Sequence, residues 1–214
     1  MGSKISLNNL EKTDVLKEIL KPENKLSSVV KRLLDIFFSL LGLLFFFLLL
    51  PIIAVLIKID FRAPVFYCQK RVGKDRRIFT LCKFRTMKDD PNQHKKLWRE
   101  KEEKNVTHVG KFLRKLHLDE LPQFWNILKG EMSFIGPRPE WIELAKIFEK
   151  EIPFYNYRYL VKPGFTGWAQ INFPASRSLE EAKEKFEYDL YYIKNRSLAL
   201  DIKIILKTMH IFKF

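Results

Sequence analysis

Cysteine is scarce in this chain, and its two cysteines match no metal-binding spacing. Cys68 and Cys82 are the only ones among 214 residues, whereas zinc sites need several ligands at short, characteristic spacings. We predict that both are reduced thiols in the core, on the cytoplasmic side of a membrane, and not a disulfide. The four histidines are scattered along the chain, so no Ser-His-Asp order can be read either.

Two glycine-rich signatures are missing as well. The sequence contains neither a Walker loop nor Gly-x-Gly-x-x-Gly, which removes two common signals of a nucleotide-phosphate loop. No internal repeat or low-complexity tract is visible. Outside one very apolar stretch, the chain has enough residues for a single modest soluble domain.

Negative charge is also in short supply. Aspartate and glutamate number 25 against 39 lysines and arginines, which gives a formal net charge of +14. Such an excess calls for an anionic partner, which could be nucleic acid, an acidic membrane surface or a phosphorylated substrate.

The most prominent feature present is an apolar run over residues 33–57, interrupted by Asp35, Ser39, Gly42 and Pro51. A helix over this run would extend about 37 Å, enough for a hydrocarbon core of about 30 Å. The run is too long for the core of a signal peptide, and no small-residue cleavage pattern follows it. Because a soluble helix is rarely apolar all round for this length, we predict a membrane helix.

Both flanks of this run are basic. The cations are Lys25, Lys31 and Arg32 before it and Lys58, Arg62, Lys70, Arg71, Lys74, Arg76 and Arg77 after it. Since basic flanks stay in the cytoplasm, we favour a re-entrant helix–break–helix over a helix that crosses the membrane. Pro51 would supply the break, although spanning helices also contain prolines. We expect Asp35 to pair with Lys31 or Arg32.

Several other segments have a readable pattern. Residues 10–20 suit an amphipathic helix, residues 64–84 suit short strands around a turn at 72–75, and residues 89–104 suit an exposed loop or helix. The aromatic residues of 153–174 suit either a core or a membrane interface. Residues 197–214 predict either a helix at the bilayer interface or an ordinary packed helix.

Asp119 and Glu120 are adjacent acids in Leu-Asp-Glu-Leu-Pro-Gln-Phe-Trp-Asn at residues 118–126. Apolar residues continue at helical spacing, and Gly130 is a suitable stop. We predict a helix that starts at Asp119, with Asp119 as N-cap and Pro122 in the first turn. Asp119 is then either only a cap, or an ionised carboxylate beside an anionic substrate and able to attack phosphorus. The local sequence leaves both interpretations open.

Cations precede and follow the two acids. Lys83 and Arg85 alternate in a predicted strand and would share one face. Arg114 lies in a basic segment shortly before Asp119, and Arg138 follows in Gly-Pro-Arg-Pro at residues 136–139. Each cluster alone suits a solvated surface. Together they favour an anion site beside the carboxylates, because arginine binds phosphate bidentately.

Six motifs occur in a fixed order along most of the chain. They are Lys-Arg-Leu-Leu-Asp at 31–35, Lys-Phe-Arg-Thr-Met at 83–87, Leu-Asp-Glu-Leu-Pro-Gln at 118–123, Gly-Glu-Met-Ser-Phe-Ile-Gly-Pro-Arg-Pro at 130–139, Pro-Gly-Phe-Thr-Gly-Trp-Ala-Gln at 163–170 and Tyr-Asp-Leu-Tyr-Tyr at 188–192. From about residue 31 to the end, the chain resembles the bacterial sugar transferases, the monotopic polyprenol-phosphate phosphoglycosyl transferases. It departs from the usual family pattern at Phe173-Pro174 and at His117.

The resemblance implies an enzyme that transfers a sugar-1-phosphate from a UDP-sugar to undecaprenyl phosphate and releases UMP. Asp119 carries over as the nucleophile that forms a covalent phosphosugar intermediate, and Glu120 as its essential partner. Arg138 and Arg114 are assigned to substrate phosphate binding, with Lys83 and Arg85 as further candidates. Magnesium is the family cofactor, and Asp119 and Glu120 would hold it. Nucleic acid has no part in this reaction.

We therefore expect an α/β, mainly helical fold in the minimal catalytic form of the family. Residues 1–30 would be an N-terminal extension, 31–62 the re-entrant membrane helix, and 63–214 a catalytic domain on the cytoplasmic leaflet of a bacterial inner membrane, with amphipathic helices at the interface. The sugar, the glycan pathway and the oligomeric state stay open, with a homodimer as one option. The rival is a non-enzymatic basic membrane adaptor for anionic lipid or nucleic acid, which would not explain the acids among the cations.

Overall fold

The structure, a computed structural model, describes residues 2–7, 13–21, 24–88, 105–174 and 176–211. It is mainly helical with two small two-stranded sheets, which confirms the helix-rich fold. A first helix, α1 (Thr13–Leu20), covers part of the predicted amphipathic segment. The exposed loop or helix predicted over residues 89–104 lies outside the described residues.

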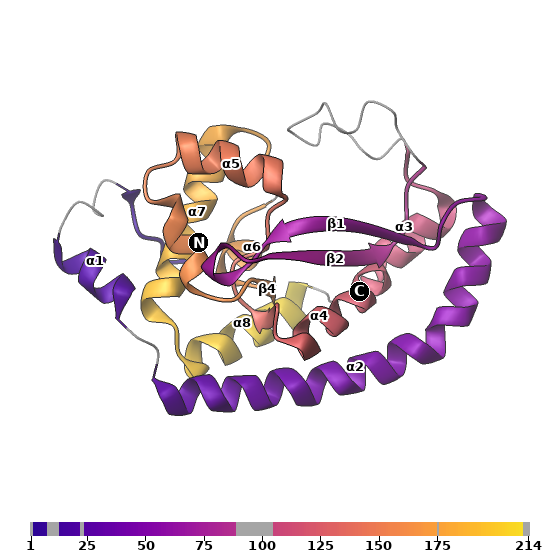
Figure 1. Ribbon diagram of the computed structural model, residues 1–214, viewed down its shortest axis with the longest axis horizontal. Coiled ribbons are helices and arrows are strands. Elements are labelled where there is room, and N and C mark those ends of the chain that lie inside the picture. The colour runs from indigo at the N-terminus through magenta and orange to yellow at the C-terminus, as the bar shows by residue number, and fades with distance from the viewer. Residues whose placement is uncertain (1, 8–12, 22–23, 89–104, 175, 212–214) are drawn as a thin grey trace.

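Helix α2 (Lys25–Asp60) contains the whole apolar run and follows one side of the molecule (Figure 1). Asn24 caps it, since its side-chain oxygen accepts a hydrogen bond from the Leu26 backbone N–H at 2.9 Å. Among the described helices, α2 alone is long and apolar enough to cross a membrane. The predicted interruption at Pro51 is absent, because the helix continues through that residue. Figure 1 shows instead that α2 changes direction toward its C-terminal end; a missing backbone donor at proline is a recognised cause of such bending.

The two sides of α2 differ in what covers them. Its inner side contributes Leu43, Phe46, Ile53 and Ile57 to a buried cluster with Phe84, Leu113 and Leu121. Its outer side leaves large apolar residues exposed, among them Leu33, Phe37, Leu41, Leu44, Leu48, Ile52 and Val55. Exposure of this apolar surface to water costs free energy, so the outer side of α2 suits a lipid environment.

Asp35 is buried near the start of α2 but does not form the expected ion pair with Lys31 or Arg32. Its Oδ1 accepts hydrogen bonds from the Ser133 hydroxyl at 3.1 Å and the Phe134 backbone N–H at 3.0 Å. The two cations instead bind groups of other elements. The expectation from helical spacing is therefore wrong, because tertiary partners replace the neighbours one turn away.

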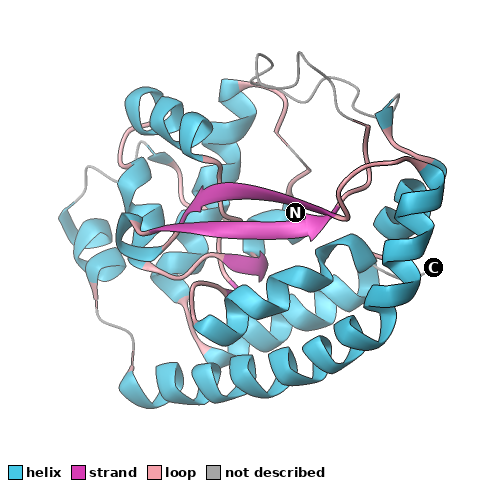
Figure 2. Ribbon diagram, turned by 45° about the vertical axis from the view of Figure 1, so that its right-hand side comes forward, coloured by secondary structure: helices cyan, strands magenta, loops and turns pink. Residues whose placement is uncertain are grey.

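Strands β1 (Phe66–Val72) and β2 (Ile78–Phe84) form an antiparallel hairpin with the short helix η2 (Lys74–Arg76) at its turn, which confirms the prediction of short strands around a turn. Figure 2 shows the hairpin across the middle of the molecule, with helices on both sides. Cys68 pairs directly with Cys82 across the two strands, 4.1 Å apart at their Cα atoms, and the two form a disulfide. The prediction of reduced thiols is therefore wrong, because it took no account of the register that brings the pair together.

The second half of the chain builds the other core. It contains β3 (Ser133–Ile135) parallel to β4 (Gly164–Thr166), helices α5 (Ile142–Glu151), α6 (Trp168–Asn172) and α7 (Leu179–Asn195), and the 3-10 helix η6 (Tyr155–Leu160). Most of the crowded aromatic residues pack in this core, including Tyr155, Tyr159 and Trp168. Glycine is required at the start of β4: a Cβ on Gly164 would lie 2.1 Å from the backbone nitrogen of Gly136, which follows β3.

Helix α8 (Leu198–Ile211) ends the described chain and shows two distinct sides. Asp201 and Ile204 are buried against the domain. Ile202, Ile205, Leu206 and Met209 are exposed, between 41% and 65% of their surface. The apolar residues of α8 are therefore only partly used inside the protein.

Candidate active site

The two adjacent acids lie in a 3-10 helix, η5 (Leu118–Gln123), which leads into helix α4 (Phe124–Lys129). The prediction that Asp119 caps an α-helix is wrong: His117 precedes η5 in a left-handed conformation (φ 54°), and α4 starts only at Phe124. Gly130 does end α4, as predicted, with φ 85°. The tight η5 turn buries both Asp119 and Glu120 to 8% exposure.

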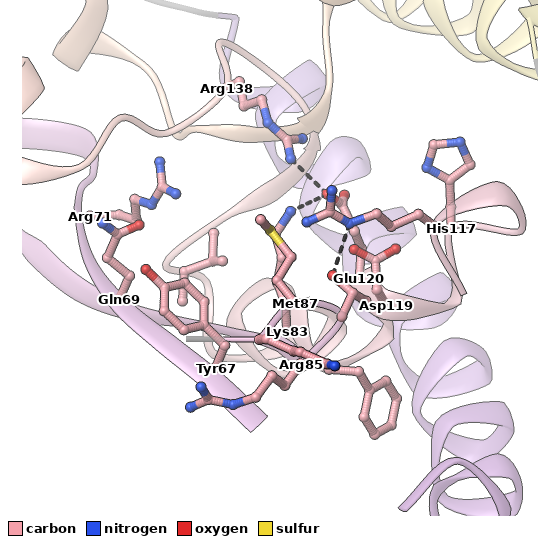
Figure 3. Close-up of a pocket in the computed structure, with 15 residues that line it drawn as sticks. Tyr67, Gln69, Arg71, Lys83, Arg85, Met87, His117, Asp119, Glu120 and Arg138 are labelled. Carbon is pink, nitrogen blue, oxygen red and sulfur yellow. Dashed lines mark hydrogen bonds and ion pairs between the residues drawn. The ribbon is translucent and has the colours of Figure 1, made fainter. Parts of the chain in front are cut away.

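A cavity of about 270 Å³ opens between the inner face of the hairpin, η5 and the loop that carries Arg138 (Figure 3). Asp119, Glu120, Lys83, Arg85, Arg114 and Arg138 all line it. The structure thus brings together, from four separate segments, all six residues that the sequence suggested for the site.

Glu120 is held between two cations. Its Oε1 accepts a hydrogen bond from Nη2 of Arg138 at 2.6 Å and another from Nζ of Lys83. Burial alone would raise the pKa of Glu120, but the charges of Arg138 and Lys83 hold that pKa well below its usual range. Burial and the charge of Arg138 lower the pKa of Lys83 to about 8. Glu120 is therefore a fixed anion whose charge two cations offset.

Asp119 lies beside this cluster with an open carboxylate. Within the part of the chain that the structure describes, no side chain or backbone group donates a hydrogen bond to it or forms an ion pair with it. Burial raises the pKa of Asp119, and the charge of Glu120 raises it further, whereas Lys83, Arg114 and His117 act in the opposite direction. The idea that a helix N-terminus holds this carboxylate ionised is wrong, since η5 is a short 3-10 turn and burial dominates.

The other two predicted cations differ in their engagement. Arg114 donates from Nε to the Thr86 hydroxyl at 2.8 Å and remains part of the cavity wall. Arg85 donates from Nε to the Pro64 carbonyl at 3.1 Å, and its guanidinium carbon lies 5.9 Å from the Tyr67 ring centre. Figure 3 shows the Arg85 side chain directed away from the two acids. Arg85 is thus at the rim, and Lys83 and Arg138 are at the centre.

Comparison with known proteins decides the family. A profile described as bacterial sugar transferase matches residues 26–213. The chain belongs to the bacterial sugar transferase family. This confirms the resemblance drawn from the six motifs.

Individual relatives of this sugar transferase carry related names. An Aeromonas hydrophila protein called UDP-N-acetylgalactosamine-undecaprenyl-phosphate N-acetylgalactosaminephosphotransferase is 44% identical over 87% of this chain and 46% of its own length. A Klebsiella pneumoniae UDP-glucose:undecaprenyl-phosphate glucose-1-phosphate transferase is 42% identical over 88% of this chain and 41% of its own. The chain therefore spans about half the length of these curated relatives. A Bacillus subtilis protein called an uncharacterized sugar transferase is 37% identical over 85% of this chain and 86% of its own.

Sequence reasoning missed one wall of the sugar transferase cavity. Tyr67, Gln69 and Arg71 of β1 line it, and they alternate along the strand, so they share one face. That alternation was the available signal. Arg71 also belongs to the basic flank of the apolar run, so its charge alone does not indicate a place in a site.

A buried ion pair behind the Pro-Arg-Pro loop was also missed. Arg158 donates from Nε to Oδ2 of Asp189 at 2.8 Å and from Nη2 to the backbone carbonyl of Arg138 at 2.6 Å. Arg71 supports the same loop by donating to the Pro139 carbonyl at 2.9 Å. Asp189 stands in the Tyr-Asp-Leu-Tyr-Tyr motif, but nothing in the sequence marks Arg158. These contacts fix the backbone from which Arg138 reaches Glu120.

Proposed function

We propose that this protein transfers a sugar-1-phosphate from a UDP-sugar to undecaprenyl phosphate, as the first membrane step in the assembly of a bacterial glycan. The observation that carries the proposal is the Asp119 carboxylate, which lines a cavity and has no hydrogen-bond partner among the described residues. Beside it, Lys83 and Arg138 compensate the charge of Glu120, and further cations line the same cavity. The names of the relatives support the two substrates. The family also supports catalysis over the rival interpretation of a basic adaptor.

The reaction would proceed in two displacements at phosphorus. In the first, an Asp119 carboxylate oxygen attacks the phosphorus that carries the sugar, the bond from that phosphorus to the bridging oxygen breaks, and UMP leaves with that oxygen. In the second, a phosphate oxygen of undecaprenyl phosphate attacks the same phosphorus and releases the Asp119 carboxylate. Lys83, Arg114 and Arg138 would bind the phosphate oxygens, whose negative charge they match.

The donor set fits magnesium in the mode that uses substrate oxygens. No cluster of three or more His, Cys, Asp or Glu side chains occurs among the described residues, so a dedicated protein cage is not available there. Mg²⁺ is commonly bound by one or two carboxylates together with substrate phosphates and water. Asp119 and Glu120 would hold the ion, which would neutralise charge on the diphosphate.

The apolar surfaces support a place on the membrane. The outer side of α2 and the exposed side of α8 present large apolar residues. Basic residues flank both ends of the apolar run, and α2 bends rather than running straight (Figure 1). We propose that α2 is re-entrant and that the catalytic cavity faces the cytoplasm, where a soluble nucleotide sugar and a lipid phosphate can both reach it.

Labelling from the same side at the start of α2 and in β1, the strand that follows α2, is the expected result of this topology. Lys25→Cys and Lys70→Cys would be made separately in a background with Cys68 and Cys82 replaced by serine. In sealed inverted vesicles, a membrane-impermeant maleimide should label both positions, because both would face the outside of such vesicles. Labelling of one position in inverted vesicles and the other only in right-side-out vesicles would show a spanning helix instead.

Release of UMP should identify the sugar donor. A panel of UDP-sugars would be incubated with the detergent-solubilised protein, with and without undecaprenyl phosphate. One donor should give continuous UMP release with the lipid and no more than about one UMP per protein molecule without it, because the covalent intermediate then accumulates. The adaptor interpretation expects no UMP from any donor and a binding affinity that falls steeply with salt.

A further inference from the structure

A second cavity, of about 470 Å³, lies at the start of α2 and shares no lining residue with the candidate active site. It is bounded by α2, the hairpin turn and the segment before β4. Its charged lining is mostly basic: Lys31, Arg32, Lys74, Lys162 and Arg196 against Asp35 and Asp75. We call it the basic cavity.

The acids near the basic cavity do not balance its cations. Asp35 is hydrogen-bonded to Ser133 and Phe134. Asp201, outside the lining, pairs with Lys31 at 2.5 Å. Lys162 makes no hydrogen bond or close ion pair with any described residue. A surplus of cations with an unpartnered lysine favours an anionic occupant.

The electrostatics around Lys162 support this conclusion. Burial lowers the pKa of Lys162, the charges of Arg32, Lys74 and Lys31 lower it further, and the charge of Asp35 acts in the opposite direction. Like charges therefore crowd around a half-buried ammonium. An anion in their midst would relieve that repulsion.

Two of the cations converge on one point. Nη2 of Arg32 and Nζ of Lys162 each lie 3.3 Å from the position that a Cβ on Gly130 would occupy. The Arg32 guanidinium is fixed there, because it donates to the carbonyls of Ile127 at 2.7 Å and Leu128 at 2.6 Å. A fixed guanidinium with a second cation close by is an arrangement that can bind a phosphate group.

The position of the basic cavity points to a membrane lipid as the source of that phosphate. Arg32 is followed directly by Leu33 and Leu34, which are 62% and 47% exposed and begin the outer apolar side of α2. Cations at the end of an apolar membrane segment lie at the level of lipid headgroups. We propose that the basic cavity binds the phosphate group of an anionic phospholipid headgroup, with the acyl chains along the outer side of α2. This binding is independent of the transfer reaction.

Thermal unfolding of the full chain in an uncharged detergent tests the proposal. Dihexanoyl phosphatidylglycerol at about a hundred times its dissociation constant should raise the unfolding midpoint of the wild type by roughly 5–10 °C. Lys162→Gln should lose most of that shift, and Lys74→Gln part of it. Lys150→Gln, whose side chain is 84% exposed on α5, should keep it in full.

Further measurements distinguish a lipid phosphate from a soluble phosphate and check that the Lys162 variant is folded. Dihexanoyl phosphatidylcholine should give a smaller shift, and glycerol phosphate or inorganic phosphate almost none; an equal shift with glycerol phosphate would make the occupant a soluble phosphate and refute the lipid assignment. Without lipid, Lys162→Gln should melt no lower than the wild type, since it removes a crowded cation. Equal lipid shifts in the wild type and all three variants would overturn the site.

Discussion

Replacing Asp119 with asparagine should abolish covalent capture of the sugar phosphate and reduce the turnover rate by at least about a thousandfold. Asparagine has the shape of aspartate, so the buried η5 turn should be preserved, but its amide oxygen is a far weaker nucleophile. The wild type, given a UDP-sugar labelled in the sugar and no lipid acceptor, should hold about one label per molecule after denaturation. Asp119→Asn should hold none.

Asp75→Asn is the matched control for this experiment. Asp75 lies in the hairpin turn with φ 52°, which asparagine tolerates well, and it is outside the candidate active site. It should trap label like the wild type. Equal labelling of Asp119→Asn would remove Asp119 from the role of nucleophile.

The pKa of Asp119 gives the same assignment a second readout. The attacking group must be ionised, and burial together with Glu120 raises this pKa. The rate of labelling should therefore fall as the pH is lowered through the Asp119 pKa, at a higher pH than an ordinary aspartate would require. Glu120 should contribute no such fall, because its pKa is held well below the usual range.

Replacing Arg158 with methionine should destabilise the protein by about 3–5 kcal/mol, because the change leaves buried charge without a partner. The Arg158 side chain is 5% exposed and binds Asp189, the Tyr155 hydroxyl and the Arg138 carbonyl. For a chain of this size, the expected fall in the unfolding midpoint is roughly 6–20 °C. Arg158→Lys should recover only part of it, since an ammonium cannot reproduce three directed contacts.

Arg76→Met provides the comparison for Arg158. Arg76 also pairs with an acid, Glu149, but its side chain is 57% exposed, so its removal should cost less than about 1 kcal/mol. A double variant with Asp189→Leu beside Arg158→Met should regain stability relative to Arg158→Met alone, because it removes the orphaned carboxylate. Similar losses for Arg158→Met and Arg76→Met would contradict the role of burial.

Local patterns predicted the parts of this fold that depend on neighbouring residues. The hairpin follows from β-favouring residues around a turn, and the end of α4 from Gly130, which adopts the left-handed conformation. The apolar run over residues 33–57 predicted a membrane helix, but not that the helix continues through Pro51. Lys83, Arg85, Asp119, Glu120 and Arg138 could be proposed as site residues because they stand in the ordered motifs, and Arg114 because it lies in the basic segment shortly before Asp119.

Contacts between distant segments could not be predicted in the same way. The pairing of Cys68 with Cys82 depends on strand register, and a shift of one residue would separate them. The left-handed His117 sets where η5 begins, although histidine does not specify that conformation. Asp35 and Arg158 find partners about a hundred and about thirty residues away, respectively. In each case tertiary geometry chose among options that the local sequence allowed.

The buried side of α2 limits how this protein can be made soluble. Leu43, Phe46, Ile53 and Ile57 pack against Phe84, Leu113 and Leu121, and Phe84 directly follows Lys83. A fragment cut to start after α2 would expose this half-cluster to water and loosen the strand that carries Lys83. A water-soluble version is better sought by keeping the helix and replacing outward residues such as Leu44 and Leu48, which are 71% and 69% exposed, with polar ones. For protein engineering, the buried side of α2 is part of the domain core and has to be kept, whereas its exposed apolar residues can be replaced.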